Sequence, residues 1–162
     1  LYWSKVKGTD FARSILPSRD YRIPFGKGNM VLEAENPTSK NTVLVVTYGM
    51  GVHWTLNAAK SFEGKIGILD LRTLYPLDEE LIFSKTKEYN KVMVVTEESV
   101  NNTFAQSVAS RIQQNCFQYL DAPVFTVGSE NLPAIPLNEV LEKTMVYSAE
   151  KMVIDIEKLL RY

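Results

Sequence analysis

From residue 42 onward, apolar runs of strand length alternate with stretches of helical periodicity. Residues 43–48 form a continuous apolar run rich in β-branched side chains, which predicts a strand buried on both faces. Shorter runs at residues 66–71, 92–95 and 123–127 predict further strands. This alternation predicts an α/β fold, with repeated β-α units around a mostly parallel sheet.

Helices are predicted between and after these strands, because apolar residues recur there at intervals of three or four positions. The helix after residue 78 is predicted from its start, since Asp78 can accept the first free backbone N–H groups and Glu79 suits the positive end of the helix dipole. A last helix is expected to begin near Ser148. Three of the predicted helices have clear apolar sets. They are Val52, Leu56, Ala59 and Phe62 in the helix after the first strand; Phe104, Val108, Ala109 and Ile112 in the helix after the third strand; and Met152, Val153, Ile156 and Leu159 in the last helix.

Residues 1–41 follow neither pattern for long, and prolines and glycines interrupt them as turns. We therefore divide the chain into an arm or linker at residues 1–41 and one α/β domain at residues 42–162. The chain begins with Leu1 and not with a methionine, so we expect it to be a piece of a longer protein.

Charge and cysteine content restrict the partners and the compartment. With 18 basic and 19 acidic residues, the formal net charge is −1, so nucleic acid and anionic membrane surfaces are not expected partners. No apolar run reaches the roughly 18 residues that a membrane span needs. Cys116 is the single cysteine, which excludes an internal disulfide and fits a reducing compartment, the cytosol or an organelle matrix. Its apolar neighbours predict an inert, buried thiol.

Gly49 and Gly51 lie between a strand and a helix, and Asp70 closes the next strand, an order found in dinucleotide-binding folds. That fingerprint needs a third small residue where the helix meets the strand, and Trp54 stands there instead. We therefore interpret the two glycines as a tight turn at the end of a strand and not as a cofactor loop.

Few other residues are candidates for chemistry. His53 is the only histidine and would lie in the first turn of a helix; with no second histidine to share a metal and no nearby nucleophile, a structural or interface role is favoured over that of a general base. Asp70 and Arg72 place opposite charges at the carboxyl end of a strand, where a salt bridge would fix the following loop. Glu97 and Glu98 are neighbours on a strand and point to opposite faces, so a shared proton is not expected.

Several short sequence motifs are more specific to one protein family than these patterns are. They stand at residues 23–28, 46–53, 70–78, 84–86 and 120–124, with Glu97 between the last two. In their order and spacing they resemble the C-terminal half of the beta subunit of a thiamine-diphosphate-dependent 2-oxo acid dehydrogenase, of the pyruvate or branched-chain type. Residues 70–78 are the most specific part, and the likeness covers nearly the whole chain. Residues 129–135 resemble chains in which alpha and beta parts are fused.

The resemblance implies a transketolase C-terminal-like domain, preceded in the parent by a pyrimidine-binding domain. The fold that it implies is a three-layer doubly wound α/β sheet of about five mostly parallel strands with helices on both faces, which agrees with the alternation of strands and helices described above. It implies that the parent enzyme, an oxidoreductase, decarboxylates a 2-oxo acid on thiamine diphosphate and Mg and passes the acyl group to a lipoyl-acyltransferase. The residues that hold the cofactor and the metal belong to other domains in the family. We therefore expect no catalytic, cofactor-binding or metal-binding residue in this segment, and no activity of the domain alone.

The resemblance also implies partners: an alpha subunit or fused alpha half, a second beta chain, and the subunit-binding domain of a dihydrolipoyl acyltransferase. Docking of the acyltransferase is assigned to Leu160, Arg161 and Tyr162, whose terminal carboxylate suits an arginine. The predicted interface is completed by His53, Asp70 and Arg72. The implied location is the bacterial cytoplasm or, in a eukaryote, the mitochondrial matrix.

Two other readings stay open at this point. The equivalent domain of a transketolase or a deoxyxylulose phosphate synthase would share the fold but have no lipoyl partner. A stand-alone flavodoxin-like nucleotide-binding module is the second, although the missing third glycine argues against it. Pyruvate, branched-chain 2-oxo acids and acetoin all remain open as substrates of the parent.

Overall fold

A computed structural model describes residues 15–162 of the chain. Its centre is a five-stranded sheet in the order β1-β3-β2-β4-β5. Strands β2 to β5 are mutually parallel, and only β1 runs antiparallel, against β3. The strands are β1 (Asn29–Leu32), β2 (Val43–Thr47), β3 (Ile66–Asp70), β4 (Val92–Ser99) and β5 (Phe125–Ser129). The predicted sheet of about five mostly parallel strands is confirmed.

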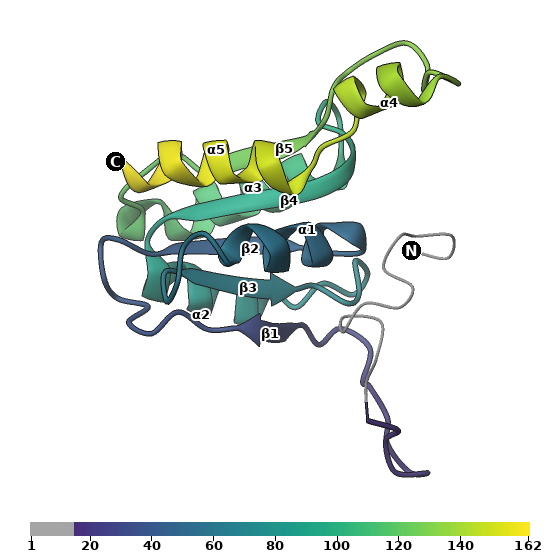
Figure 1. Ribbon diagram of the computed structural model, residues 1–162. Helices are drawn as coiled ribbons and strands as arrows, with labels where there is room; N and C mark the ends of the chain where they lie inside the picture. The colour runs from purple at the N-terminus through teal and green to yellow at the C-terminus, as the bar shows by residue number, and fades with distance from the viewer. Residues whose placement is uncertain (1–14) are drawn as a thin grey trace.

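Helices cover both faces of the sheet, so the molecule has three layers (Figure 1). They are α1 (Met50–Ala59), α2 (Glu79–Tyr89), α3 (Phe104–Cys116), α4 (Glu139–Met145) and α5 (Ala149–Leu160), with a short 3-10 helix η2 (Phe117–Tyr119). Helices α1 and α5 pack on one face, and α2 and α3 pack on the other. Figure 1 shows α4 set apart from these layers.

Strand β2 explains the continuous apolar run of the sequence. Successive side chains of a strand point to opposite faces, so Val43 and Val45 enter the core under α1 and α5, while Leu44 and Val46 enter the core under α2 and α3. All four are fully buried. A central strand between two helical layers therefore needs apolar side chains at every position.

Side-chain caps begin four of the helices. Asp78, Thr103, Asn138 and Ser148 each accept a backbone N–H from the first turn of the helix that follows. The predicted helix starts at Asp78 and Ser148 are confirmed. Each such cap satisfies a donor that the helix cannot satisfy itself.

One strand and one α-helix were not predicted. Strand β1 lies within residues 1–41, where no element was expected, and it pairs with β3 through Asn29 and Asp70 and through Leu32 and Ile68, with a bulge between. Helix α4 lies between β5 and α5, where no element was expected. Both are short, and neither buries a clear apolar face, so the periodic signal that marks the other elements is weak there.

The parallel strands give the sheet two distinct edges. The carboxyl edge is the side on which Thr47, Asp70, Ser99 and Ser129 end their strands, and the amino edge is the opposite side, where Val43 and Val92 begin theirs. Because β1 is antiparallel, the arm before Asn29 approaches at the carboxyl edge. The C-terminus lies at the amino edge (Figure 1).

Candidate protein interface

The loop after β3 begins with a tight turn at the carboxyl edge. Asp70 Oδ1 accepts the backbone N–H of Arg72 at 3.0 Å, and Arg72 has a positive φ of 54°. Within residues 15–162 no ion pair joins the two side chains, so the predicted salt bridge is wrong. The turn itself brings the backbone donor to the carboxylate, and the Arg72 side chain is exposed to solvent.

Asp78 ends this loop and joins it to the arm. Its buried carboxylate accepts the N–H of Gly28 through Oδ2 at 3.0 Å and caps α2 by accepting the N–H of Leu81 through Oδ1 at 3.3 Å. Lys27 Nζ lies 3.8 Å from Oδ1. One carboxylate therefore fixes the position of the arm and the start of α2 together.

A second contact between arm and loop lies nearby. The N–H of Gly26 donates to Thr73 Oγ1 at 2.9 Å. Gly26 has a φ of 70°, and a Cβ there would lie 2.8 Å from Pro76 Cγ, so both its backbone conformation and its surroundings favour glycine. The sequence motifs at residues 23–28 and 70–78, which lie far apart in the chain, thus form one structural unit.

Large side chains of this unit are exposed. Tyr21, Ile23 and Phe25 of the arm and Tyr75 of the loop all point into solvent. They were not among the predicted site residues, because apolar residues scattered in a turn-rich segment give no periodic signal. Large exposed side chains on one unit are typical of protein contact surfaces.

His53 lies at the same edge. It occupies the first turn of α1, which directly follows β2, and it is half buried. Thr47 at the end of β2 pairs with Asp70 at the end of β3, so the fold brings His53, Asp70 and Arg72 to one edge of the sheet, where neighbouring parallel strands end together.

The turn before α1 is closed by contacts within the protein. Gly49 has a φ of 59°, and a Cβ on Gly51 would overlap Thr47 Oγ1. Trp54 packs edge-on against Tyr147, with ring centroids 6.1 Å apart. The two glycines thus serve a tight turn, and an aromatic ring fills the position where a dinucleotide loop needs a small residue.

Glu97 and Glu98 face different surroundings. Glu98 Oε1 accepts the hydroxyl of Tyr48 at 3.1 Å, whereas the backbone carbonyl of Glu97 accepts the hydroxyl of Ser129 at 2.7 Å, and both glutamates are exposed. Burial, with a further contribution from Glu98, raises the pKa of Tyr48, although its hydrogen bond with Thr96 opposes the rise. The pair is not arranged to share a proton.

The C-terminal residues lie at the opposite, amino edge. The Lys91 ammonium, with the residue only 3% exposed, donates to the Lys40 carbonyl at 2.6 Å and to the Leu160 carbonyl at 3.4 Å. The Tyr162 ring packs edge-on against Phe125, with centroids 6.1 Å apart, and Arg161 is exposed. The six predicted interface residues therefore form two groups on opposite edges of the sheet.

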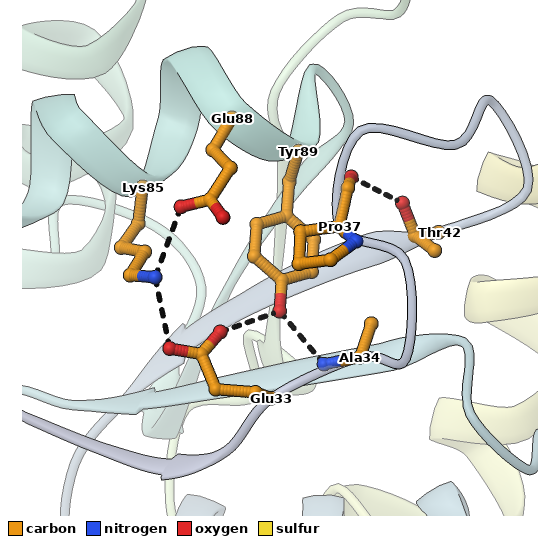
Figure 2. Close-up of polar contacts among 7 residues, drawn as sticks. All are labelled: Glu33, Ala34, Pro37, Thr42, Lys85, Glu88 and Tyr89. Carbon is orange, nitrogen blue, oxygen red and sulfur yellow. Dashed lines mark hydrogen bonds and ion pairs between the residues drawn. The ribbon is translucent and has the colours of Figure 1, made fainter.

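A polar network holds β1 to α2, as Figure 2 shows. The Tyr89 hydroxyl accepts the N–H of Ala34 at 2.9 Å and donates to Glu33 Oε2 at 3.0 Å. Lys85 Nζ bridges Glu33 at 2.8 Å and Glu88 at 2.9 Å. Burial raises the pKa of Tyr89 to about 12; the N–H of Ala34 opposes the rise, and Glu33 adds to it. Because these groups bind one another and join two segments of the fold, we interpret the network as structural.

Other kinds of site find little support in the described part of the chain. Residues 15–162 contain no group of three or more side chains that could hold a metal ion. Cys116 is a free, buried thiol, as predicted, and burial raises its pKa. Within the same residues, no helix has the length and apolar character needed to cross a bilayer.

Known proteins match both the sequence and the fold. Residues 32–152 match the family described as "Transketolase, C-terminal domain". The chain is 31% identical over 166 residues to the 2-oxoisovalerate dehydrogenase subunit beta of Bacillus subtilis, covering 100% of this chain and 49% of that protein. It is 29% identical over 137 residues to the pyruvate dehydrogenase E1 component subunit beta of Rhizobium meliloti, covering 83% of this chain and 28% of that protein. The chain thus spans half or less of the length of these relatives.

A solved structure with a similar fold is a split gene transketolase, described as an inactive beta4 tetramer. It superposes with a TM-score of 0.69 at 22% identity, over 91% of this chain and 46% of that chain. The relatives include bacterial proteins and eukaryotic proteins named as mitochondrial. The chain therefore belongs to the transketolase C-terminal domain family, and along its whole length it is similar to beta subunits of 2-oxo acid dehydrogenases.

Proposed function

We propose that this chain is the C-terminal assembly domain of a 2-oxo acid dehydrogenase beta subunit. The parent enzyme would decarboxylate a 2-oxo acid with thiamine diphosphate and Mg bound outside this chain, and would pass the acyl group to a lipoyl-acyltransferase. The observation that carries the proposal is the unit built around Asp78, which joins the arm to the loop at 70–78 and leaves Phe25 and Tyr75 exposed at the carboxyl edge.

The chain's own residues would act by position and by surface. Asp78 and Thr73 fix the arm through the N–H groups of Gly28 and Gly26, and thereby the direction from which a preceding domain would approach. His53, Asp70 and Arg72 lie on the same edge and would contact the neighbouring parts of the enzyme, an alpha subunit or fused alpha half and a second beta chain.

The amino edge would serve a different partner. Leu160, Arg161 and Tyr162 end α5 there, and we assign to them the docking of the acyltransferase subunit-binding domain. The exposed Arg161 guanidinium offers an ion pair to a carboxylate of that domain. Two edges with two different partners explain why the predicted interface residues need not be adjacent. The location that follows is the bacterial cytoplasm or the mitochondrial matrix.

The test is light scattering after size-exclusion chromatography, on the chain alone and mixed with an acyltransferase subunit-binding domain, at low and at moderate salt. A complex that weakens as salt rises is the expected result, because the contact is ionic. Arg161→Ala should weaken it, while Lys60→Ala, a change at an exposed position on α1's C-terminal cap, should not. If the chain does not bind the subunit-binding domain, the docking assignment is wrong. The same result is expected if the parent is a transketolase-type enzyme, which has no lipoyl partner.

A second assay tests the expectation that this chain alone does not decarboxylate a 2-oxo acid. The chain supplied with thiamine diphosphate, Mg and pyruvate or a branched-chain 2-oxo acid should release no carbon dioxide above background. Measurable turnover would contradict the assignment of an assembly role to this domain.

A further inference from the structure

Helix α4 and the segment before it expose an aliphatic surface. Its members are large apolar side chains that lie within ten residues of one another and are all exposed, and we call them the α4 patch: Leu132, Ile135, Leu137, Val140 and Leu141. Figure 1 shows α4 beyond the carboxyl edge, away from the helices that cover the sheet. Within residues 15–162, nothing buries this patch.

The domain holds α4 by one end only. Met145 is the buried residue of the helix, and its carbonyl accepts the N–H of Glu130 at 2.9 Å. Lys151 Nζ donates to the carbonyls of Thr144 at 2.8 Å and Val146 at 3.1 Å. Helices shorter than about 12 residues are marginal in water without packing against another surface. Helix α4 has two turns and exposes its apolar side chains to solvent. We therefore infer that these side chains pack against a partner, which would stabilise the helix.

Carboxylates outnumber ammonium groups around the α4 patch. Between residues 130 and 145 the chain carries three carboxylates, those of Glu130, Glu139 and Glu142, and one ammonium, that of Lys143. The Lys151 ammonium is a second cation, bound to carbonyls at the C-terminal end of the helix. Lys143 already pairs with Glu139 at 2.9 Å. A second copy placed against the patch would bring two acidic rims together, which costs free energy. The complementary surface is apolar at its centre and basic at its rim.

We propose that the α4 patch docks into an apolar surface rimmed by lysine or arginine on protein outside this chain. The inference deepens the proposed assembly role, on which it rests, by naming the contact and the chemistry of its partner. It assigns that contact to a helix distinct from His53, Asp70 and Arg72, and from the C-terminal docking residues.

The test uses the complete parent enzyme purified from its own source, so the partner need not be known in advance. Hydrogen exchange of the backbone amides in residues 139–145 is measured by mass spectrometry in that enzyme and in this chain alone. Exchange slowed at least about tenfold in the assembled enzyme is the expected result, because a covered helix must open before it exchanges. Equal exchange in the two samples would overturn the proposal.

Matched variants of the parent enzyme supply the second measurement. Leu141 and Ile154 are each 55% exposed aliphatic residues, on α4 and on α5 respectively. Leu141→Ser should weaken assembly, measured as the midpoint of dissociation on dilution, by roughly tenfold, and Ile154→Ser by less than about twofold. Glu142→Lys should also weaken assembly, and added salt should reduce the difference between Glu142→Lys and wild type.

Two further outcomes separate the alternatives. Protection of α4 that arises in this chain alone as its concentration rises, and that Leu141→Ser removes, would identify a second copy and overturn the basic partner. A parent enzyme without 2-oxo acid dehydrogenase activity but with a protected α4 would defeat the proposed function and leave the docking surface standing.

Discussion

The ring of Tyr89 lies directly across Gly67. Tyr89 reaches from the end of α2 over β3 to hold β1, and a Cβ on Gly67 would lie within 2.7 Å of Tyr89 Cε1. Gly67→Ala should therefore push the ring away from Glu33 and Ala34 and lower the free energy of unfolding by about 1–3 kcal/mol. Urea denaturation followed by circular dichroism measures this. A change below about 0.5 kcal/mol, typical of surface sites, would show that the ring adjusts freely.

Asp78 provides a second test of how the arm is held. Asp78→Ala removes the acceptor of both Gly28 N–H and Leu81 N–H, and loss of a helix cap alone costs about 1 kcal/mol. With the arm contact included, we expect a loss of about 2 kcal/mol in the free energy of unfolding and faster proteolysis within residues 15–28. Glu80→Ala is the matched control, since Glu80 is an exposed carboxylate in the first turn of the same helix. Equal effects of the two substitutions would contradict the role of Asp78.

These contacts show where sequence reasoning succeeds and where it stops. The run at 43–46 predicts a central strand because burial on both faces requires an apolar residue at every position, and the cap at Asp78 is a local signal. Strand β1 was missed because a short edge strand depends on a partner far away in the chain, as Asn29 pairs with Asp70, and periodicity does not reveal such a pairing.

The positions of the predicted interface residues in the fold follow only in part from the sequence, for the same reason. The common edge of His53 and Asp70 follows from the rule that parallel strands end together. The separation of these residues from Tyr162 depends on the direction of α5, and the exposure of Leu141 depends on α4 standing apart from the sheet. Both are results of packing between distant segments, which a local pattern does not contain.

The stability of the domain should fall in strongly alkaline solution through Tyr89. Its pKa is raised from an ordinary 10.0 to about 12 in the folded protein, so the unfolded chain loses the proton first as pH rises. Fewer protons are then bound in the unfolded state, and the free energy of unfolding decreases between pH 10 and about 12. The contribution is fully present below pH 10. Chemical denaturation at pH 9, 10 and 11 should show this decrease.

Comparison of two tyrosine variants isolates that contribution. In Tyr89→Phe the free energy of unfolding should decrease less than in wild type over the same pH range. Part of the decrease should remain, because burial and Asp155 also raise the pKa of Tyr147. Tyr75→Phe should behave as wild type, because Tyr75 is exposed in the folded protein and its surroundings change little on unfolding. An unchanged slope in Tyr89→Phe would contradict the assignment.

Lys91 should control the order of the C-terminal docking residues. Lys91→Met keeps the length of the side chain but removes the donor of the Leu160 and Lys40 carbonyls. Loss of hydrogen bonds from a charged donor costs about 1–3 kcal/mol, and removing a buried ammonium recovers part of that cost, so the net loss of stability should be about 1 kcal/mol. The larger effect is local, since the end of α5 loses its tie to the start of β4, and amide exchange at residues 159–162 should accelerate.

The control for this substitution is Lys65→Met. Lys65 precedes β3 as Lys91 precedes β4, but its side chain is exposed, so its replacement should change the stability by less than about 0.5 kcal/mol and leave exchange at residues 159–162 unaltered. If Lys91 positions the docking residues, Lys91→Met should also weaken binding of the acyltransferase subunit-binding domain at low salt, and Lys65→Met should not. Faster exchange without weaker binding would mean that the acyltransferase contacts a part of the amino edge other than the end of α5.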